Sequence, residues 1–257
     1  MATPPLTRVL EREARVWRHF WRSTVVFNFI NPLMFLAALG LGLGGLVERS
    51  TGKVDGLPYL SFIAPGLMAA GALQASALNS LWPMMAGIKW MGTFQAMVAS
   101  PISPSAVYGG EVLWNVARST LGAVMFLAAA ALLGGIPSPW GVLAVPAAAL
   151  CALSVAAPLT AWAAMQETDV PFSVVARLGI VPIFLFSGTF FPVKQLPSGV
   201  RPVVVLSPLW HGVELCRAAT TGRWDPGPQA LHVAVLVALA AAGWQWGTRT
   251  FTQRLTP

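Results

Sequence analysis

Charged side chains are scarce in this sequence. Only 10% of the 257 residues are Asp, Glu, Lys or Arg, whereas a soluble globular domain has about 25%. Hydrophobic residues make up 56% of the chain. This balance excludes an ordinary soluble domain and predicts an integral membrane protein. The regular alternation of polar and apolar residues that is typical of a transmembrane β-barrel is also missing. We therefore expect an all-α integral membrane protein.

Residues that bind metals or act as nucleophiles are equally sparse. The chain has two cysteines and three histidines, with no C-x-x-C, H-E-x-x-H or G-x-S-x-G pattern. The sequence therefore predicts no metal site and no catalytic site. We interpret Cys151 and Cys216 as small apolar residues without a disulfide between them, and the histidines as scattered. The phosphate-binding G-x-x-x-x-G-K-[ST] loop is absent too, so ATP and its Mg²⁺ would have to be bound by another chain.

Six apolar segments are each long enough to cross a bilayer, which takes about 20 helical residues. They cover residues 24–46, 59–82, 106–133, 141–165, 174–191 and 229–248, within a single transmembrane domain spanning 1–257. Basic residues gather before the first segment: Arg8, Arg12, Arg15, Arg18 and Arg22. The positive-inside rule then places the N-terminus in the cytoplasm, and six spans place the C-terminus there as well. The net charge of +7 thus reflects topology and contact with anionic lipids, and we expect no nucleic acid as a partner.

The N-terminal arm, residues 6–22, has arginines spaced by three or four positions and apolar residues on much of the opposite side. This pattern predicts an amphipathic helix that lies in the membrane interface. A secretory signal peptide is the alternative. The apolar stretch that follows is too long for one and ends without a clear small-residue cleavage site.

The longest cytoplasmic connection joins the second and third segments. Its centre, residues 88–98, has helical spacing. Ile88 begins it, and we expect Trp90, Phe94, Met97 and Val98 on its exposed side. A short amphipathic helix outside the membrane suits a groove on a cytosolic partner. The alternative is a helix that only lies on the membrane surface.

Charged and polar residues within the apolar segments mark a second set of candidates. Glu111, Asn115 and Arg118 share one face of the third segment. They predict either a polar network near the cytoplasmic entrance of a pathway or, through Arg118, a contact with an anionic head group. The alternative is snorkelling of their side chains toward the interface. Glu167 and Asp169 lie in the turn between the fourth and fifth segments, where they either brace an inner gate or are simply solvated.

Four stretches carry a family resemblance. FLFSGTFFPVKQLP followed by SPLWHGVELCRA resembles the signature of type-2 ATP-binding-cassette (ABC) exporter permeases. TFQAMVASPISPSAVYGGE resembles the coupling segment of the same family, and FIAPGLM resembles the entry to its second span. The similarity extends over essentially the whole chain. It is greatest to the subgroup of nodulation lipo-oligosaccharide exporter permeases and daunorubicin-type drug exporter permeases.

The resemblance implies that residues 192–217 form a re-entrant helical hairpin on the outer side, between the fifth and sixth spans. Short apolar helices broken by prolines agree with that expectation, because such segments are too short to span a bilayer. An ordinary outer loop is the alternative. The hairpin motif consists of Ser187, Gly188, Phe191, Pro192, Pro197, Pro208 and Arg217.

The resemblance also implies a function. The chain would be a permease subunit in the bacterial cytoplasmic membrane, paired with a second copy or a paralogue and with two copies of a separate ABC ATPase that holds ATP and Mg²⁺. Its substrate would be amphipathic: a lipid-linked saccharide, a glycolipid or a hydrophobic drug. Aromatic candidates for the pathway are Trp114, Phe126, Phe184 and Phe186. The alternatives are an ion-gradient-driven secondary transporter and a membrane-embedded enzyme. The first lacks internal repeats and midplane carboxylates here, and the second lacks an acid/base constellation.

Overall fold

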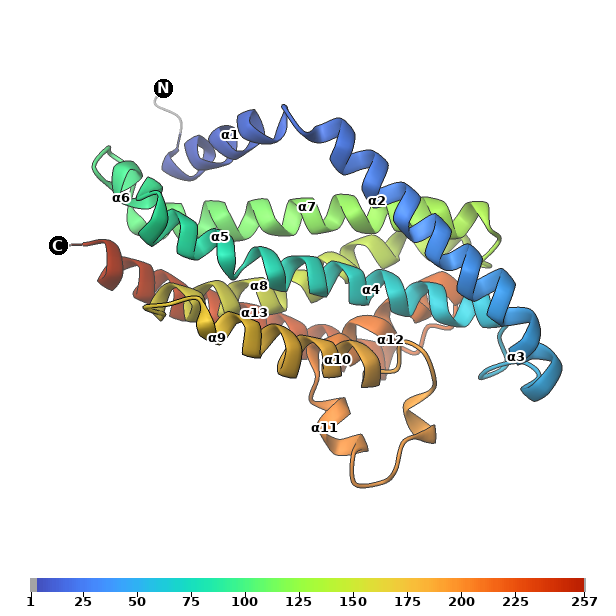
Figure 1. The fold of residues 1–257 in the computed structure, drawn as a ribbon. Helices are drawn as coiled ribbons and strands as arrows, with labels where there is room; N and C mark the ends of the chain where they lie inside the picture. Colours follow the sequence, from blue (N-terminus) through green and yellow to red (C-terminus); the bar gives the residue numbers. More distant parts are fainter. Residues whose placement is uncertain (1–3, 257) are drawn as a thin grey trace.

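The computed structural model describes residues 4–256, with all side chains in that range except those of residues 27, 41, 43, 47, 48, 50 and 51. This described part is almost entirely helical, and its one β-type pairing is the isolated bridge between Val54 and Leu57. Figure 1 shows long helices that run side by side as a bundle. Helices α1 and α6 and the C-terminus lie at one end of the bundle, and α3 lies at the other.

The α-helices are α1 (Pro5–Trp17), α2 (Trp21–Leu36), α3 (Gly44–Thr51), α4 (Tyr59–Asn79), α5 (Trp82–Met85), α6 (Thr93–Val98), α7 (Pro104–Leu132), α8 (Ala144–Met165), α9 (Val170–Val174), α10 (Val181–Phe186), α11 (Arg201–Val205), α12 (Pro208–Thr221) and α13 (Pro226–Leu255). Three π-helical stretches join neighbours into longer helices: η1 (Ala37–Leu43), η2 (Ala86–Trp90) and η4 (Val175–Ile180). Two short 3₁₀ helices, η3 (Pro139–Leu143) and η5 (Val193–Gln195), complete the set.

Five continuous helices in the described residues are long and apolar enough to cross a membrane: Trp21–Leu46, Tyr59–Trp90, Pro104–Leu132, Pro139–Met165 and Pro226–Leu255. The fifth expected segment, 174–191, is a shorter apolar helix over Val170–Phe186. It ends early because the chain turns at Gly188, whose φ of +79° is readily available only to glycine. The protein is therefore a multi-pass, helical membrane protein.

Small residues allow the central helices to pack closely. Gly243 of α13 lies directly against Pro158 of α8, where a side chain would meet backbone atoms. The hydroxyl of Tyr108 in α7 lies 3.0 Å from the carbonyl oxygens of Ala157 and Gly243. Close backbone approach and hydrogen bonds hold membrane helices together, since lipid offers no hydrophobic driving force between them.

The N-terminal arm is helical only to Trp17, so the expected helix over 6–22 is shorter than predicted. The chain turns at residues 18–20, and α2 begins at Trp21. Val9 of α1 is buried against Gly110 of α7, and the Trp17 ring meets the edge of Trp114 with 6.3 Å between ring centroids. The apolar side of the arm thus packs on α7.

Candidate functional site

The segment expected to contact a partner forms a folded turn at one end of the bundle, which we call the coupling turn (residues 86–98). Its π-helical first part ends at Trp90, and Gly92 then adopts φ +61° before α6 begins. Trp90 and Met91 are 59% and 68% exposed. They are large apolar side chains at the tip of a turn, and packing within this chain does not explain their presence there.

The expectation that Phe94 and Met97 are exposed is wrong. Phe94 is only 3% exposed, and Met97 and Ile88 are also buried. The left-handed turn at Gly92 folds α6 back, so that the Phe94 ring lies on Gly87 and 6.1 Å from the ring of Phe251 in α13. An unbroken helix over 88–98 would place these side chains outward, and the break at Gly92 turns them inward.

An ion-pair cluster connects the coupling turn to two other parts of the protein. Glu167, in the turn after α8, accepts hydrogen bonds from Lys89 of the coupling turn and from Arg254 near the end of α13. The Lys89 ammonium also donates to the backbone carbonyl of Glu167, at 2.8 Å. These hydrogen bonds lower the pKa of Glu167, and the one from Lys89 has the largest effect. Asp169 lies at the start of α9, and its side chain makes no ion pair within the described residues.

The three residues expected to share one polar network face different neighbours. The Glu111 carboxylate lies beside the arm, 3.9 Å from the Arg12 guanidinium. The Asn115 amide donates to the carbonyl oxygen of Ser76, at 2.8 Å, and to the hydroxyl of Ser80, at 3.0 Å.

Asn115 thus joins α7 to α4, and Ser76 in turn donates to the carbonyl of Ala152 in α8, at 2.9 Å. Its observed contacts are those of a helix-packing residue. Arg118 is exposed, and it is the middle residue of α7. This central position lies away from the cytoplasmic end at which the sequence analysis had placed the network.

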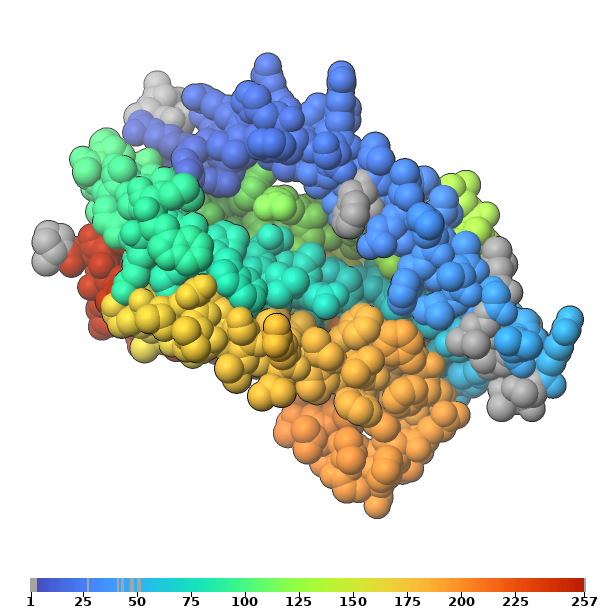
Figure 2. Space-filling model, in the orientation of Figure 1, coloured from blue at the N-terminus to red at the C-terminus, as the bar shows by residue number. Residues whose placement is uncertain are grey.

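Arg118 faces a cavity of about 420 Å³ between α2, α4 and α7. Figure 2 shows the hollow on one face of the molecule, between α2 and α4, with α7 behind it. Phe126 of α7 and Phe184 of α10, two of the aromatic pathway candidates, line it. The other two lie elsewhere: Trp114 packs on the arm, and Phe186 is exposed outside the cavity. The remaining lining residues are Asn28, Asn31, Pro32, Phe35, Leu67, Met68, Gly71, Ala72, Gln74, Ala75, Leu78, Ser119, Gly122 and Ala123.

The first half of the hairpin motif forms a buried turn after α10. The Gly188 carbonyl accepts a hydrogen bond of 2.8 Å from Arg217 of α12. The same guanidinium donates to Glu214, at 2.9 Å, and its carbon lies 4.1 Å from the centroid of the Phe62 ring in α4. Arg217 therefore ties the end of the fifth apolar helix to α4 and α12.

Two further contacts hold this turn. The hydroxyls of Ser187 and Ser207 are 3.0 Å apart, and Gly66 of α4 lies so close to Thr189 that a Cβ atom would stand 2.9 Å from the Thr189 carbonyl oxygen. The Phe62–Met68 stretch and the Ser187-Gly188 turn, which the sequence resemblance picked out separately, thus form one packed unit.

The second half of the motif has two unlike parts. Phe191 and Pro192 lead into η5, the Pro197 carbonyl accepts from Val200, and this loop with α11 projects from the bundle (Figure 1). Pro208 begins α12, which Ser207 caps by accepting from the Leu209 amide at 3.2 Å. Most of α12 is buried against α4, α8 and α13.

The structure also brings together two histidines that the sequence analysis described as scattered. Their Nδ1 atoms, on His211 of α12 and His232 of α13, are 2.8 Å apart, and Trp210 packs on both rings. The sequence signal for this pair is that the two histidines lie at similar distances before and after Gly222, where α12 ends and the chain reverses into α13. Two helices that pack after a tight turn bring residues at similar distances from the turn to the same level.

Comparison with known proteins decides the family. The family described as "ABC-2 type transporter" matches residues 6–220. This chain belongs to the ABC-2 type transporter family. The resemblance noted in the sequence is therefore confirmed, and the chain is a membrane subunit of the ABC-2 type.

Curated relatives agree with that assignment over nearly the full length. Nodulation protein J of Rhizobium meliloti (strain 1021) is 28% identical over 249 residues, which cover 97% of this chain and 93% of the relative. Nodulation protein J of Azorhizobium caulinodans is 30% identical, covering 91% and 92%. The inner membrane transport permease YadH of Escherichia coli (strain K12) is a more distant relative, 23% identical over 92% of this chain and 90% of its own.

Proposed function

We propose that this chain is the permease subunit of an ATP-driven exporter that moves an amphipathic substrate across the bacterial cytoplasmic membrane. Two permease chains line the pathway, and two copies of a separate ABC ATPase bind ATP and Mg²⁺ beneath them. Membership of the ABC-2 type transporter family supports the ATPase partner. The relative YadH, named as an inner membrane transport permease, supports the location.

The observation that carries the proposal is the exposed pair Trp90 and Met91 at the tip of the coupling turn. This tip lies at the same end of the bundle as the arginine-rich arm and the C-terminus (Figure 1). The basic arm favours the cytoplasmic side for that end. An apolar pair on a short structured turn suits a hydrophobic groove on a cytosolic partner.

Movement of the ATPase would pass into the membrane through the contacts behind this tip. Phe94 packs on Phe251 of α13, and Lys89 is paired with Glu167 after α8. Packed helices shift as rigid bodies and transmit small displacements over their length. In this account Phe94, Met97 and Ile88 support the coupling turn from inside, and Trp90 and Met91 contact the ATPase.

The proposed outer hairpin comprises the projecting loop with α11 and the buried helix α12. The arm packs on α7 and presents its arginines to the anionic membrane surface, as an interfacial helix does. With Val170–Phe186 as a sixth, shorter span, both termini are cytoplasmic. The Ser187-Gly188 turn fixed by Arg217 would then close the outer end of the fifth span.

Affinity purification in mild detergent tests the proposal. The tagged wild-type chain should recover an ABC ATPase in a one-to-one ratio. Trp90→Asp and Met91→Asp should each abolish that recovery, because each inserts a charge into the apolar contact. Trp140→Asp is the matched control: Trp140 is 61% exposed, in η3, and recovery should be unchanged.

Recovery of the chain without any ATPase, in an assembly that transports in response to an ion gradient, would instead establish the secondary-transporter alternative. Equal ATPase recovery with wild type and both tip variants would show that the partner binds elsewhere on the chain.

A further inference from the structure

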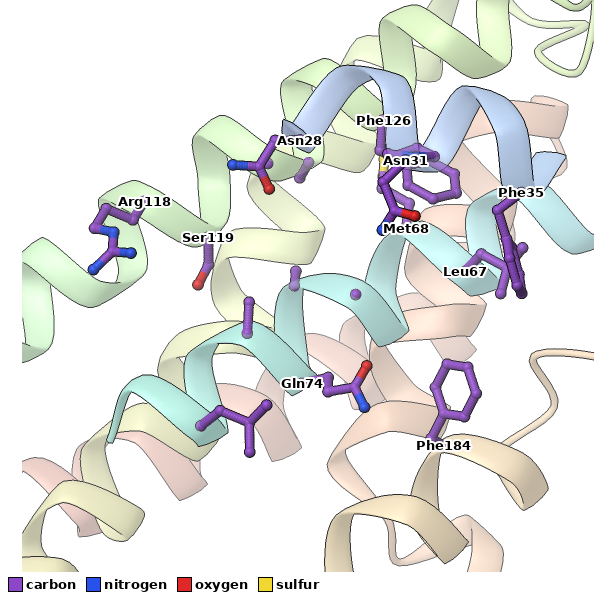
Figure 3. Close-up of a pocket in the computed structure, with 17 residues that line it drawn as sticks. Asn28, Asn31, Phe35, Leu67, Met68, Gln74, Arg118, Ser119, Phe126 and Phe184 are labelled. Carbon is purple, nitrogen blue, oxygen red and sulfur yellow. The ribbon is translucent and has the colours of Figure 1, made fainter. Parts of the chain in front are cut away.

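The cavity between α2, α4 and α7 has a polar end, where Arg118, Ser119 and Asn28 lie, and two further amides, Asn31 and Gln74, farther along it (Figure 3). Arg118, Asn28, Asn31 and Gln74 line it, and none of their side chains makes a hydrogen bond or an ion pair within the described residues. Ser119, only 3% exposed, also lines the cavity, and its hydroxyl has no partner among the described residues. A buried polar group is normally satisfied, so the Ser119 hydroxyl indicates a polar group bound in the cavity. Arg118 and Asn31 are exposed and Asn28 and Gln74 are partly exposed, so their hydrogen-bonding positions are open to the same ligand.

The opposite end of the cavity is mainly apolar, with the amides of Asn31 and Gln74 among its side chains (Figure 3). Phe35 of α2, Leu67 of α4, Phe126 of α7 and Phe184 of α10 line it. Figure 3 shows Arg118, Ser119 and Asn28 toward one side of the cavity, with Phe35, Leu67 and Phe184 toward the other. The cavity thus changes along its length from a cationic end to a mainly aromatic end.

The position of the cation adds a second argument. Arg118 is the middle residue of a 29-residue helix, which at about 1.5 Å per residue is longer than the bilayer core of about 30 Å. A charged side chain at that depth is costly unless it faces a polar cavity or a counter-charge, and such residues mark pathways for ligands. In the described structure Arg118 faces the cavity and has no carboxylate partner.

We infer that this cavity binds an amphiphile with an anionic phosphate or carboxylate head. The Arg118 guanidinium and the Ser119 hydroxyl donate to the anion. Asn28 binds a hydroxyl or amide group next to it, and Asn31 and Gln74 bind such groups farther along the ligand, since each amide both donates and accepts.

The acyl or prenyl chain of the ligand lies along the aromatic end of the cavity. A volume of about 420 Å³ is typical of small-molecule sites and accommodates a head group with the first part of a chain. The inference rests on the proposed function, because it gives the exporter a substrate site within each permease chain.

Equilibrium binding of radiolabelled dodecyl phosphate tests the inference. The full chain is reconstituted in nanodiscs of phosphatidylcholine, which has no net charge. Saturable binding is expected, and excess dodecyltrimethylammonium, which has the same chain and a cationic head, should not compete. Arg118→Gln should weaken binding about tenfold or more, as expected for loss of a charge-assisted hydrogen bond. Arg177→Gln is the control, since Arg177 is also exposed in an apolar helix but lies outside the cavity.

A second variant guards against a folding defect. Ser119→Ala removes a hydroxyl that has no partner in the described residues, so the unliganded protein should be as stable as wild type, while dodecyl phosphate binding weakens several-fold. Unchanged binding in both Arg118→Gln and Ser119→Ala would overturn the inference, as would failure of the wild type to bind.

The source of the ligand and the proposed function are tested separately. Replacing part of the phosphatidylcholine with phosphatidylglycerol should displace dodecyl phosphate if membrane lipid fills the site, and should leave binding intact if the site is kept for an exported substrate. Arg118→Gln should still recover the ATPase in the affinity purification. If dodecyl phosphate does not bind while the ATPase is still recovered, only the inference about the cavity is overturned. If the wild type does not recover the ATPase, only the proposed function is overturned.

Discussion

Replacing Arg217 with methionine should destabilise the protein more than any single change to an exposed arginine. Its guanidinium is buried between α4 and α12, where it donates to the Gly188 carbonyl and to Glu214 and lies on the Phe62 ring. Methionine fills a similar length of space and removes these interactions, together with a 3.5 Å hydrogen bond from Arg217 to the Phe62 carbonyl. The turn after α10 would then lose its contact with Arg217 of α12 and keep the one between Ser187 and Ser207.

The size of the effect follows from what each lost contact leaves behind. The Gly188 carbonyl becomes a buried acceptor without its Arg217 donor, which costs about 1–3 kcal/mol, and the cation–π contact with Phe62 contributes about 1 kcal/mol. The Glu214 side chain is 33% exposed, so water replaces much of its lost pairing. We expect the free energy of unfolding to fall by about 2–4 kcal/mol.

Reversible unfolding in mixed micelles, followed by tryptophan fluorescence as the fraction of SDS rises, measures this free energy. Arg223→Met is the matched control, because Arg223 also donates to backbone carbonyls, those of Asp55 and Gly56, but does so at the surface. Its effect should stay below about 1 kcal/mol, as for other exposed contacts. Equal losses of stability in the two variants would refute the claim that Arg217 fixes the turn.

Two further predictions concern packing and charge. Gly66→Ala should lower the free energy of unfolding by about 1–3 kcal/mol, because the new Cβ would stand 2.9 Å from the Thr189 carbonyl oxygen; Gly71→Ala, with open space around it in the same helix, should cause no loss in the same titration. Glu167 has a pKa below its ordinary value of 4.5, so its ion pairs stabilise the protein above that pH and are lost as the pH falls below it. Thermal unfolding of wild type should therefore show a decline below about pH 4.5 that Glu167→Gln lacks, and high salt should reduce the difference; identical pH profiles for the two proteins would show that the cluster contributes nothing.

The apolar segments were predictable because each must satisfy its own backbone in about 20 residues of lipid-facing helix. Segments 106–133 and 141–165 match Pro104–Leu132 and Pro139–Met165 closely. The fifth segment was predicted too long at its end, because a run of phenylalanines continues past Phe186 while Gly188 turns the backbone. Composition predicts that such a helix exists, and a single residue with positive φ determines where it ends.

The cavity was only partly predictable. Arg118 stood out as a charge inside an apolar segment, and Phe126 and Phe184 were aromatic candidates. Asn28 and Asn31 were not identified, because isolated amides in a long apolar helix give no sequence pattern of their own. Their significance depends on which face of α2 looks onto α4 and α7, and that rotation is set by tertiary packing.

The exposure of Phe94 was mispredicted for a related reason. Spacing along residues 88–98 fits a single amphipathic helix, and in that helix Phe94 and Trp90 share a face. Gly92 breaks the helix and turns Phe94 inward, so only Trp90 and Met91 remain outside. A glycine in the middle of a helical pattern was the available warning.

The partnership of this chain with a separate ATPase is tested most directly by the mass of the intact assembly, measured by native mass spectrometry after release from detergent. We expect two copies of this 27.2 kDa chain, or one copy with a paralogue, bound to two copies of a separate protein that hydrolyses ATP. In Trp90→Asp the mass should fall to that of the permease alone. A stable assembly that contains no ATPase, and that transports without ATP, would contradict this partnership.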